Sequence, residues 1–262
     1  MQRLEAITEG IRQRGKKALI PFFTAFYPTE RDFADLLIAA QQSGADLVEI
    51  GLPFSDPIAD GKFIQHSSAW VLKKGFKLSK FISFFKEFRK NLEVPVVIMS
   101  YLNPVYQYGF DRFADFMREE NISGILFPDL PVEESGFLRN YFKKRNIAVI
   151  NMIAPSTDGK RIKLIARNSE GFIYLVSVFG VTGVRNQIAP ELSETINRVK
   201  SITNKPLYAG FGISTPSQAA QIARDVDGVI VGSAIIKIMM GREKNFSIKE
   251  VKAFLKAMRG AL

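Results

Sequence analysis

The sequence predicts an α/β protein in which residues 1–262 form a single (β/α)8 barrel. Short apolar segments alternate with longer amphipathic segments from one end of the chain to the other, which is the pattern of strands joined by crossover helices. Segments such as VPVVIMS and GFIYLVS are apolar on both faces, as parallel strands are when helices cover both sides of the sheet. Eight such segments favour a closed barrel, a TIM barrel, over an open sheet. The predicted strands are Ala18–Thr24, Asp46–Ile50, Val94–Ser100, Gly124–Phe127, Ala148–Ile153, Phe172–Ser177, Pro206–Ala209 and Gly228–Val231.

The amphipathic segments carry helix start signals. Thr29 precedes an apolar-periodic segment and is followed by acidic residues, the pattern of an N-cap. Pro216 stands in a predicted first turn, where its missing N–H does no harm. Two helices fall outside the repeat: Gln2–Arg14, expected to cover the bottom of the barrel, and a short helix at Ser233–Met240 after the eighth strand. The other segments predicted as helices are Phe33–Ala40, Phe137–Lys144, Ile162–Arg167, Gln218–Ala223 and Ser247–Met258.

Composition indicates an ordinary globular protein. With 47% apolar and 24% charged residues the chain can bury a full core, and no composition break divides it, so we expect one domain. No apolar run approaches the length of a membrane span, and Met1–Gly15 is too charged for a secretory signal. The chain has no cysteine, which excludes disulfides and thiol nucleophiles and leads us to expect a cytoplasmic location.

The net charge of +10 raises the question of a nucleic-acid partner. The basic residues are spread over predicted helix faces and helix ends, and no DNA- or RNA-binding motif accompanies them. We therefore interpret them as solvated surface that can attract an anionic substrate, and we expect neither a nucleic-acid nor a membrane partner.

Two glycine-bearing turns end the seventh and eighth predicted strands, at Ala209–Ser214 and Val231–Ala234. One such turn alone is most simply a tight turn. In a (β/α)8 barrel, however, these two loops and a following short helix commonly form a phosphate pocket, because bare backbone N–H groups can approach an anion closely. Both turns together therefore predict a phosphate site, to which Gly180–Gly183 could add another wall and a hydroxyl.

Carboxylates stand at the mouth of the second predicted strand. Glu49 ends the strand, and Asp56 and Asp60 follow on the next loop. Glu49 could be a structural carboxylate paired with a neighbouring cation, and either aspartate could be a turn former. A strand end at the ligand face favours a functional role, and two carboxylates facing one substrate suit a division of labour in proton transfer.

Competing chemistries find little support in the sequence. The single histidine, His66, lies just inside a predicted helix, where a surface or packing role is the simpler interpretation. No cluster has metal-ligand spacing, and no serine stands in a G-x-S-x-G turn. No lysine ends an apolar strand, which argues against a Schiff-base aldolase.

Six motifs spread over the chain resemble those of the tryptophan synthase alpha chain family, the indole-3-glycerol-phosphate lyases. The resemblance covers essentially the whole length, and the stretch LPFSDPIADG is its most specific part. The motifs are ALIPFFTA (18–25), VEIGLPFSDPIADG (48–61), YLNP (101–104), PDLPVEES (128–135), GVTG (180–183) and GFGIS (210–214).

The resemblance implies retro-aldol cleavage of indole-3-glycerol phosphate to indole and glyceraldehyde 3-phosphate. It makes Glu49 the general acid/base and Asp60 the acceptor for the indole N–H, a pairing that is chemically consistent because a ring protonated at carbon needs a fixed anion nearby. It implies no metal and no cofactor in this chain. The remaining implied site residues are Phe22, Tyr174 and Phe211 around the indole, Gly183, Gly212, Gly232 and Ser233 around the phosphate, and Tyr101, Asp129 and Thr182 near the catalytic pair.

The resemblance also implies a partner, the pyridoxal-phosphate-dependent beta chain, in an α2β2 heterotetramer that passes indole through a tunnel. The loop from Pro53 to Asp60, with Pro53 and Asp56, is then expected to lie toward that interface.

Several positions depart from the family pattern. Phe26 replaces a glycine, Lys62 replaces the proline after Asp60-Gly61, and Val178 and Phe179 replace an Arg-containing pair in the loop after the sixth strand. Alternatives therefore stay open: a catalytically weak alpha chain that mainly activates its beta partner allosterically, a free-standing lyase that releases indole, and an unrelated phosphate-binding barrel enzyme such as an isomerase.

Overall fold

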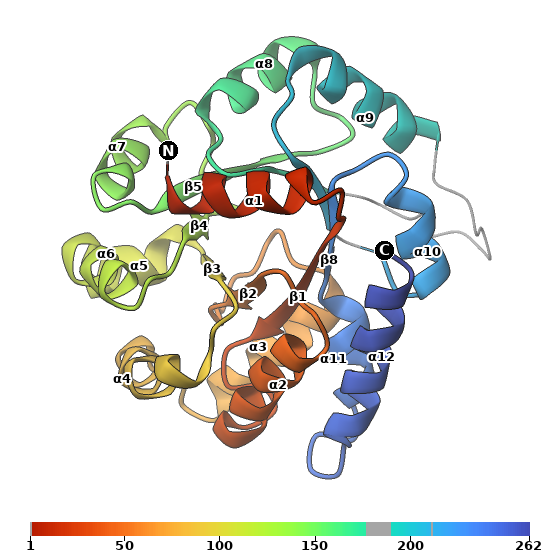
Figure 1. Ribbon diagram of the computed structural model, residues 1–262. Helices are drawn as coiled ribbons and strands as arrows, with labels where there is room; N and C mark the ends of the chain where they lie inside the picture. Colours follow the sequence, from red (N-terminus) through yellow and green to blue (C-terminus); the bar gives the residue numbers. More distant parts are fainter. Residues whose placement is uncertain (1, 177–189, 211) are drawn as a thin grey trace.

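The computed structural model describes residues 2–176, 190–210 and 212–262. Eight parallel strands close into a barrel in sequence order, and pairing between the first and last strands completes it. Helices surround this barrel on its outside (Figure 1). The prediction of a closed (β/α)8 barrel is confirmed. The strands are β1 (Ala18–Thr24), β2 (Val48–Gly51), β3 (Val96–Met99), β4 (Gly124–Leu126), β5 (Ala148–Ile153), β6 (Ile173–Val176), β7 (Leu207–Gly210) and β8 (Gly228–Val231).

The helices include the two that the sequence places outside the repeat, at the start of the chain and after β8. Predicted caps are present where they were expected: the Thr29 hydroxyl accepts a hydrogen bond from the Asp32 N–H at 3.1 Å, and Pro216 occupies a first turn. The helices are α1 (Arg3–Gln13), α2 (Glu30–Gln42), α3 (Lys62–Lys73), α4 (Leu78–Phe88), α5 (Leu102–Tyr108), α6 (Phe110–Glu119), α7 (Gly136–Lys143), α8 (Gly159–Asn168), α9 (Pro190–Ile202), α10 (Pro216–Ile222), α11 (Ser233–Met239) and α12 (Ile248–Gly260).

Helix α1 packs across the amino-terminal end of the barrel. Leu4 is fully buried and lies directly over glycine backbone: a Cβ added at Gly124 would come within 2.9 Å of its side chain, and one added at Gly171 within 2.5 Å. The Thr8 hydroxyl donates a hydrogen bond to the Gly171 carbonyl at 3.0 Å. This helix therefore covers one end of the barrel, and the opposite, carboxyl end stays available for a site.

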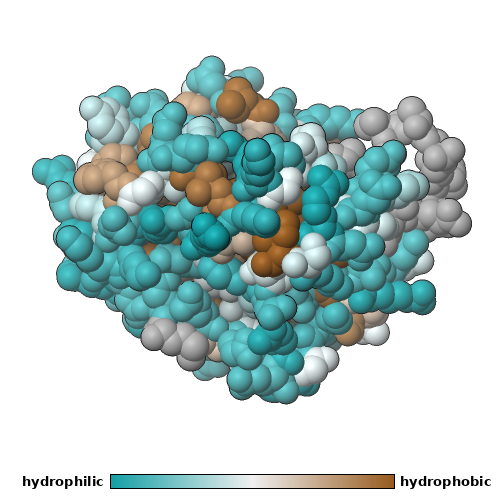
Figure 2. All heavy atoms as spheres, turned by 90° about the horizontal axis from the view of Figure 1, so that it is seen from above, coloured by the Kyte–Doolittle hydropathy of each residue, from teal (hydrophilic) through white to brown (hydrophobic). Residues whose placement is uncertain are grey.

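The face of the molecule on the side of α8 and α9 is mainly hydrophilic, with separate apolar patches among the polar side chains (Figure 2). Among the helices of the described ranges, none is long and apolar enough to cross a membrane.

Phe26, at the family's glycine position, has a backbone φ of 66°, in the left-handed region that a bulky residue rarely adopts. Its ring is buried, and it makes edge-on contacts with four aromatic rings at centroid distances of 5.2–6.0 Å. The left-handed conformation costs about 1–2 kcal/mol, whereas truncating a buried phenylalanine costs about 3–5 kcal/mol. Packing therefore outweighs the backbone strain here. The four partners are Phe33, Phe76, Phe81 and Phe84.

Restoring the family's glycine at this position is expected to destabilise the protein. Phe26→Gly relieves the strain but empties the aromatic cluster, so the free energy of unfolding should fall by roughly 2 kcal/mol. Urea unfolding measures this. Asn121→Gly is the control, since Asn121 is exposed and also left-handed (φ 57°), and should change stability by less than about 0.5 kcal/mol. A Phe26→Gly variant as stable as the parent would contradict the compensation.

Candidate active site

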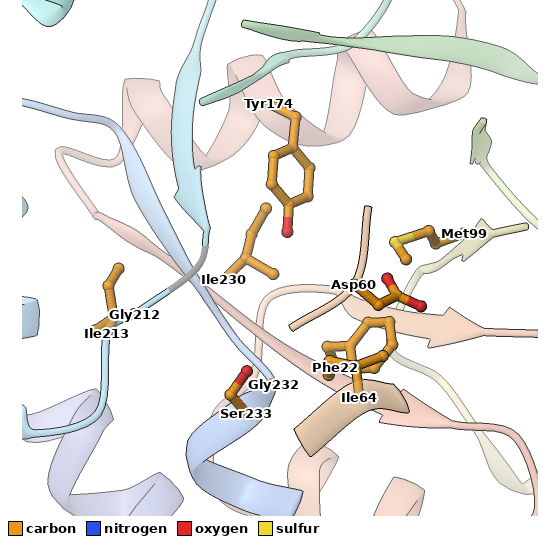
Figure 3. A pocket seen from close by; sticks show the side chains of 10 residues that line it. All are labelled: Phe22, Asp60, Ile64, Met99, Tyr174, Gly212, Ile213, Ile230, Gly232 and Ser233. Atoms are coloured by element: carbon orange, nitrogen blue, oxygen red, sulfur yellow. The ribbon is translucent and has the colours of Figure 1, made fainter. Parts of the chain in front are cut away.

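A pocket opens at the carboxyl ends of the barrel strands (Figure 3). Its empty volume, which includes space open to solvent, is about 400 Å³. Six residues that the sequence assigned to the site lie in its wall: Phe22, Asp60, Tyr174, Gly212, Gly232 and Ser233. The other wall residues are Ile64, Met99, Ile213 and Ile230. The predicted site residues Phe211, Thr182 and Gly183, and the variant positions Val178 and Phe179, lie outside the described residues.

The register of β2 against β1 turns the Glu49 side chain toward the interior of the barrel. Glu49 on β2 is the Cα partner of Phe22 on β1, so both side chains point to the same face of the sheet. The side chain is 2% exposed, and within the described residues its Oε2 has no hydrogen-bond partner and no cation pairs with it. Burial, and secondly the charge of Asp60, raise the pKa of Glu49 to about 8. The alternative of a structural ion pair has no support in this part of the chain.

Asp60 is a second buried carboxylate in this pocket. It is 9% exposed, and its Oδ1 finds no hydrogen-bond partner among the described residues. Burial raises the pKa of Asp60 to about 7, against the opposing effect of a hydrogen bond with Tyr101. Two carboxylates whose pKa values lie near neutrality can each hold or release a proton under ordinary conditions.

Tyr101 and Asp129 lie behind Asp60. The Tyr101 hydroxyl accepts a hydrogen bond from the Ala59 N–H at 2.9 Å, and Phe54 stacks on its ring at 5.0 Å. Both Asp129 carboxylate oxygens accept from the Leu102 N–H at 3.1 Å, which fixes the backbone next to Tyr101 at the start of α5. These contacts hold the backbone on which Asp60 stands.

The Phe22 ring packs against two glycines. A Cβ at Gly51 would come within 2.3 Å of the ring, and one at Gly232 within 2.9 Å. In the same way a Cβ at Gly210 would lie 2.3 Å from the Tyr174 hydroxyl. Larger residues at these positions would push the rings into the pocket, so glycine sets the shape of its aromatic wall.

The glycine turns lie across the pocket from the carboxylate. In Figure 3, Gly212 and Ile213 lie on one side and Asp60 and Met99 on the other. Gly212 has φ +79°, which favours glycine, and Gly232 and Ser233 open α11. The turns therefore present bare backbone and one hydroxyl to the part of the pocket farthest from Asp60.

The remaining predicted residues lie away from the pocket. Pro53 is buried, whereas Asp56 and Ile58 on the same loop are exposed, Ile58 by 82%. His66 is partly buried on α3 and contacts Glu243 rather than the pocket. In the ranges that the structure describes, no three histidine, aspartate or glutamate side chains gather so that they could hold a metal ion.

Sequence reasoning missed the apolar wall formed by Ile64, Met99, Ile213 and Ile230. Met99 ends β3 and Ile230 lies on β8, so a count along each predicted strand could have marked them as inward-facing. Ile64 carried no such signal, because its place depends on how α3 folds back over the barrel.

Comparison with known proteins gives one consistent result. The family model described as tryptophan synthase alpha chain matches residues 9–262. The tryptophan synthase alpha chain of Microcystis aeruginosa is 39% identical over 99% of this chain and 100% of that protein. That of Pelobacter propionicus is 38% identical over 100% of this chain and 98% of that protein.

Solved structures agree with the sequence matches. Tryptophan synthase subunit alpha from Legionella pneumophila superposes with a TM-score of 0.90 at 35% identity, covering 100% of this chain and 98% of that one. Tryptophan synthase from M. tuberculosis in its aminoacrylate-bound form gives a TM-score of 0.87 at 27% identity, covering 100% and 99%.

A closed barrel whose strand ends converge on a pocket, with a buried carboxylate in its wall and a second on the inward face of β2, defines an enzyme acting on a small substrate at the carboxyl face. Its relatives specify which one. The chain belongs to the tryptophan synthase alpha chain family, and it is a carbon–carbon lyase that cleaves indole-3-glycerol phosphate.

The raised pKa of Glu49 predicts a pH-dependent stability. An unfolded chain releases the Glu49 proton near pH 4.5, whereas the folded chain keeps it up to about pH 8. The native state therefore binds more protons across this window, so this group lowers the free energy of unfolding as pH rises. Glu49→Gln should remove this decrease in the free energy of unfolding. At pH 8.5 the free energy of unfolding of the variant should exceed that of the parent by about 2 kcal/mol or more, since one pKa unit corresponds to about 1.4 kcal/mol.

Urea unfolding at pH 5.5 and pH 8.5 checks this expectation. The control is Glu87→Gln on the exposed face of α4, which should change the free energy of unfolding by the same amount at both pH values. Equal stability of Glu49→Gln and the parent at pH 8.5 would show that burial does not perturb Glu49.

Proposed function

We propose that this chain performs the cleavage with Glu49 as general acid/base and Asp60 as the fixed anion for the indole ring. The observation that carries the proposal is that Asp60 lies in the pocket wall and Glu49 on the inward face of β2 beside Phe22. Both are buried with raised pKa values, and each has an oxygen without a partner among the described residues. Burial raises the pKa of both carboxyls, and the charge of Asp60 raises that of Glu49 further, which favours a protonated Glu49 beside an ionised Asp60. One group is thus ready to donate a proton and the other to accept a hydrogen bond.

The proposed reaction balances with these two groups. Glu49 donates its proton to C3 of the indole ring, and the resulting ring cation is stabilised by Asp60 through the indole N–H. The ionised Glu49 then assists removal of the proton from the hydroxyl on the carbon attached to C3. The carbon–carbon bond breaks, its electrons return to the ring, and indole and an aldehyde, glyceraldehyde 3-phosphate, leave.

The rest of the pocket supports one orientation of the substrate. Phe22 and Tyr174, with Met99 and Ile64, offer an apolar wall on the side of Asp60. Gly212, Gly232 and Ser233 offer backbone and a hydroxyl to the phosphate at the other end. We place Gly183 and Thr182 at the phosphate and near the catalytic pair, and Phe211 at the indole, by the family resemblance alone.

The changes near Asp60 favour a working lyase over a weak, purely regulatory alpha chain. Although Lys62 stands where the family has proline, α3 begins at this residue. The Asp60 N–H donates to the Pro57 carbonyl at 3.0 Å, and the Gln65 side chain donates to the Asp60 carbonyl at 2.8 Å. These hydrogen bonds supply the restraint that a proline ring would otherwise give.

We also propose a beta chain partner, in an α2β2 heterotetramer in which that chain alone carries pyridoxal phosphate. The exposed loop beside the pocket mouth supports this, because Ile58 presents a large apolar side chain to solvent. Next to it lies a groove walled by Phe127, Pro128, Leu130, Pro131 and Val132. A phosphorylated substrate and a chain without cysteine fit a cytoplasmic location.

Replacing the proposed acid tests the mechanism. Glu49→Gln should lower the rate of indole release from indole-3-glycerol phosphate by roughly 10²–10⁴-fold, because a positioned general acid contributes about that much. The measurement is made with and without a beta chain, with Glu87→Gln as the control. Near-normal cleavage by Glu49→Gln would remove Glu49 from this role, and absent cleavage by the parent even in the complex would favour the regulatory alternative.

A matched pair of variants tests the phosphate end. Gly212→Asn and Gly212→Asp have nearly the same shape, and asparagine and aspartate both tolerate the left-handed backbone at φ +79°. Only the aspartate adds a negative charge, so it should weaken glycerol 3-phosphate binding about tenfold or more relative to asparagine. Calorimetry measures both dissociation constants. Equal values would place the phosphate elsewhere.

A further inference from the structure

Glu243 is a buried carboxylate that takes no part in the pocket. It follows α11, and its side chain is 7% exposed. Its Oε1 accepts a hydrogen bond from the Tyr27 hydroxyl at 3.1 Å and lies 2.9 Å from the His66 Nε2. A carboxylate placed this deep needs such partners, because an unpaired buried charge is strongly destabilising.

The partners keep Glu243 ionised. Burial by itself would raise the pKa of Glu243. Hydrogen bonds from His66, from the backbone at Glu243 and Gly241, and from Tyr27 outweigh burial and bring the pKa to about 2. An ionised carboxylate can only accept, so the His66 Nε2 carries the proton in this contact. The hydrogen bond therefore exists with either a neutral or a charged imidazole.

Three separate parts of the chain meet at Glu243. Tyr27 belongs to the turn after β1, His66 to α3, and Glu243 to the turn after α11. The Tyr27, His66 and Trp70 rings pack edge-on or tilted at 6.2–6.4 Å, and the Trp70 Nε1 donates to the Pro28 carbonyl at 3.0 Å. The contact thus joins α3 to α11 with the β1 turn between them.

Both joined helices form walls of the active-site pocket. Helix α3 contributes Ile64 and directly follows Asp60, and α11 begins at Ser233, next to Gly232. If the proposed function holds, α3 carries the indole end of the substrate site and α11 the phosphate end. The separation of these helices then decides whether one substrate can reach both ends at once.

We propose that His66 and Glu243, with Tyr27 as second donor, are positioning residues that set the spacing between the Asp60 end and the phosphate end of the site. This contact of His66 and Tyr27 with Glu243 lies at a distance from the substrate and touches neither end of the site. It rests on the proposed function for the identity of the two ends. A small shift between the helices leaves each end intact but misaligns a ligand that spans them.

The test compares ligands that use one end with ligands that use both. Glycerol 3-phosphate probes the phosphate end, and a non-cleavable indole joined to phosphate by a three-carbon chain spans the site. In His66→Ala and Glu243→Ala, glycerol 3-phosphate should bind within about twofold of the parent, whereas the spanning ligand should bind about tenfold more weakly. kcat/KM for cleavage should fall roughly 10- to 100-fold. His66→Gln keeps a donor for Glu243, so it should recover most of the affinity for the spanning ligand and most of kcat/KM.

Glu250→Gln is the matched control, because it breaks the exposed pair between Arg242 of the same turn and Glu250 of α12 without reaching α3. It should leave both affinities unchanged. If the variants lose thermal stability but bind both ligands like the parent, the contact has only a structural role and the proposal is overturned. Failure of His66→Ala to fold would have the same meaning. The ratio of the two affinities is informative even if the parent fails to cleave indole-3-glycerol phosphate. That failure would contradict the proposed function alone, and the positioning role of His66 and Glu243 would still be tested by the binding of the two ligands.

Discussion

Two buried carboxylates lie at one end of the barrel, Asp60 in the pocket wall and Glu49 on the inward face of β2, and no cation among the described residues neutralises either of them. Glu49 is held there by the register of β2 against β1, which turns it inward beside Phe22. Asp60 is held by its loop, through the hydrogen bond from the Ala59 N–H to Tyr101 and the backbone bond to Pro57. Burying two such groups costs stability, because the charged form of each loses its hydration, and this raises the pKa of both. The perturbed pKa values that follow are what make proton transfer possible near neutral pH.

Glycine backbone gives the pocket its shape. Phe22 and Tyr174 lie so close to Gly51, Gly232 and Gly210 that a single added carbon would displace them. The rings therefore stay against the wall and leave open the space between Asp60 and the turns after β7 and β8. In the proposed function, the catalytic and binding ends are thus fixed by rigid strand ends and helix starts, which hold a spanning substrate more accurately than free loops would.

Two departures from the family pattern, Phe26 and Lys62, are accommodated locally. Phe26 adopts a glycine-like backbone and is held by an aromatic cluster that the high phenylalanine content supplies. Lys62 opens α3 without a proline because hydrogen bonds on both sides of Asp60 restrain the loop. Beyond them, the contact of His66 with Glu243 joins the two helices that border the pocket. At Phe26 packing offsets the backbone strain, and at Lys62 hydrogen bonds supply the restraint that a proline ring would give.

The sequence by itself determined the alternation of strands and helices, the closed barrel, the extra helices at both ends, and the candidacy of Glu49, Asp60 and the glycine turns. These features are local: periodicity, cap residues and strand-end position are written along a few neighbouring residues. Only the tertiary structure decided which side chains complete the wall, as with Ile64, Met99 and Ile230. It alone showed that Pro53 is buried while Asp56 is exposed, and that His66 meets a carboxylate 177 positions away. Such contacts depend on register, on barrel closure and on how each helix folds back, and no local pattern encodes the distance between segments so far apart. The segment around Glu49 and Asp60 indicated the candidate residues, but closure of the barrel fixed their positions relative to each other.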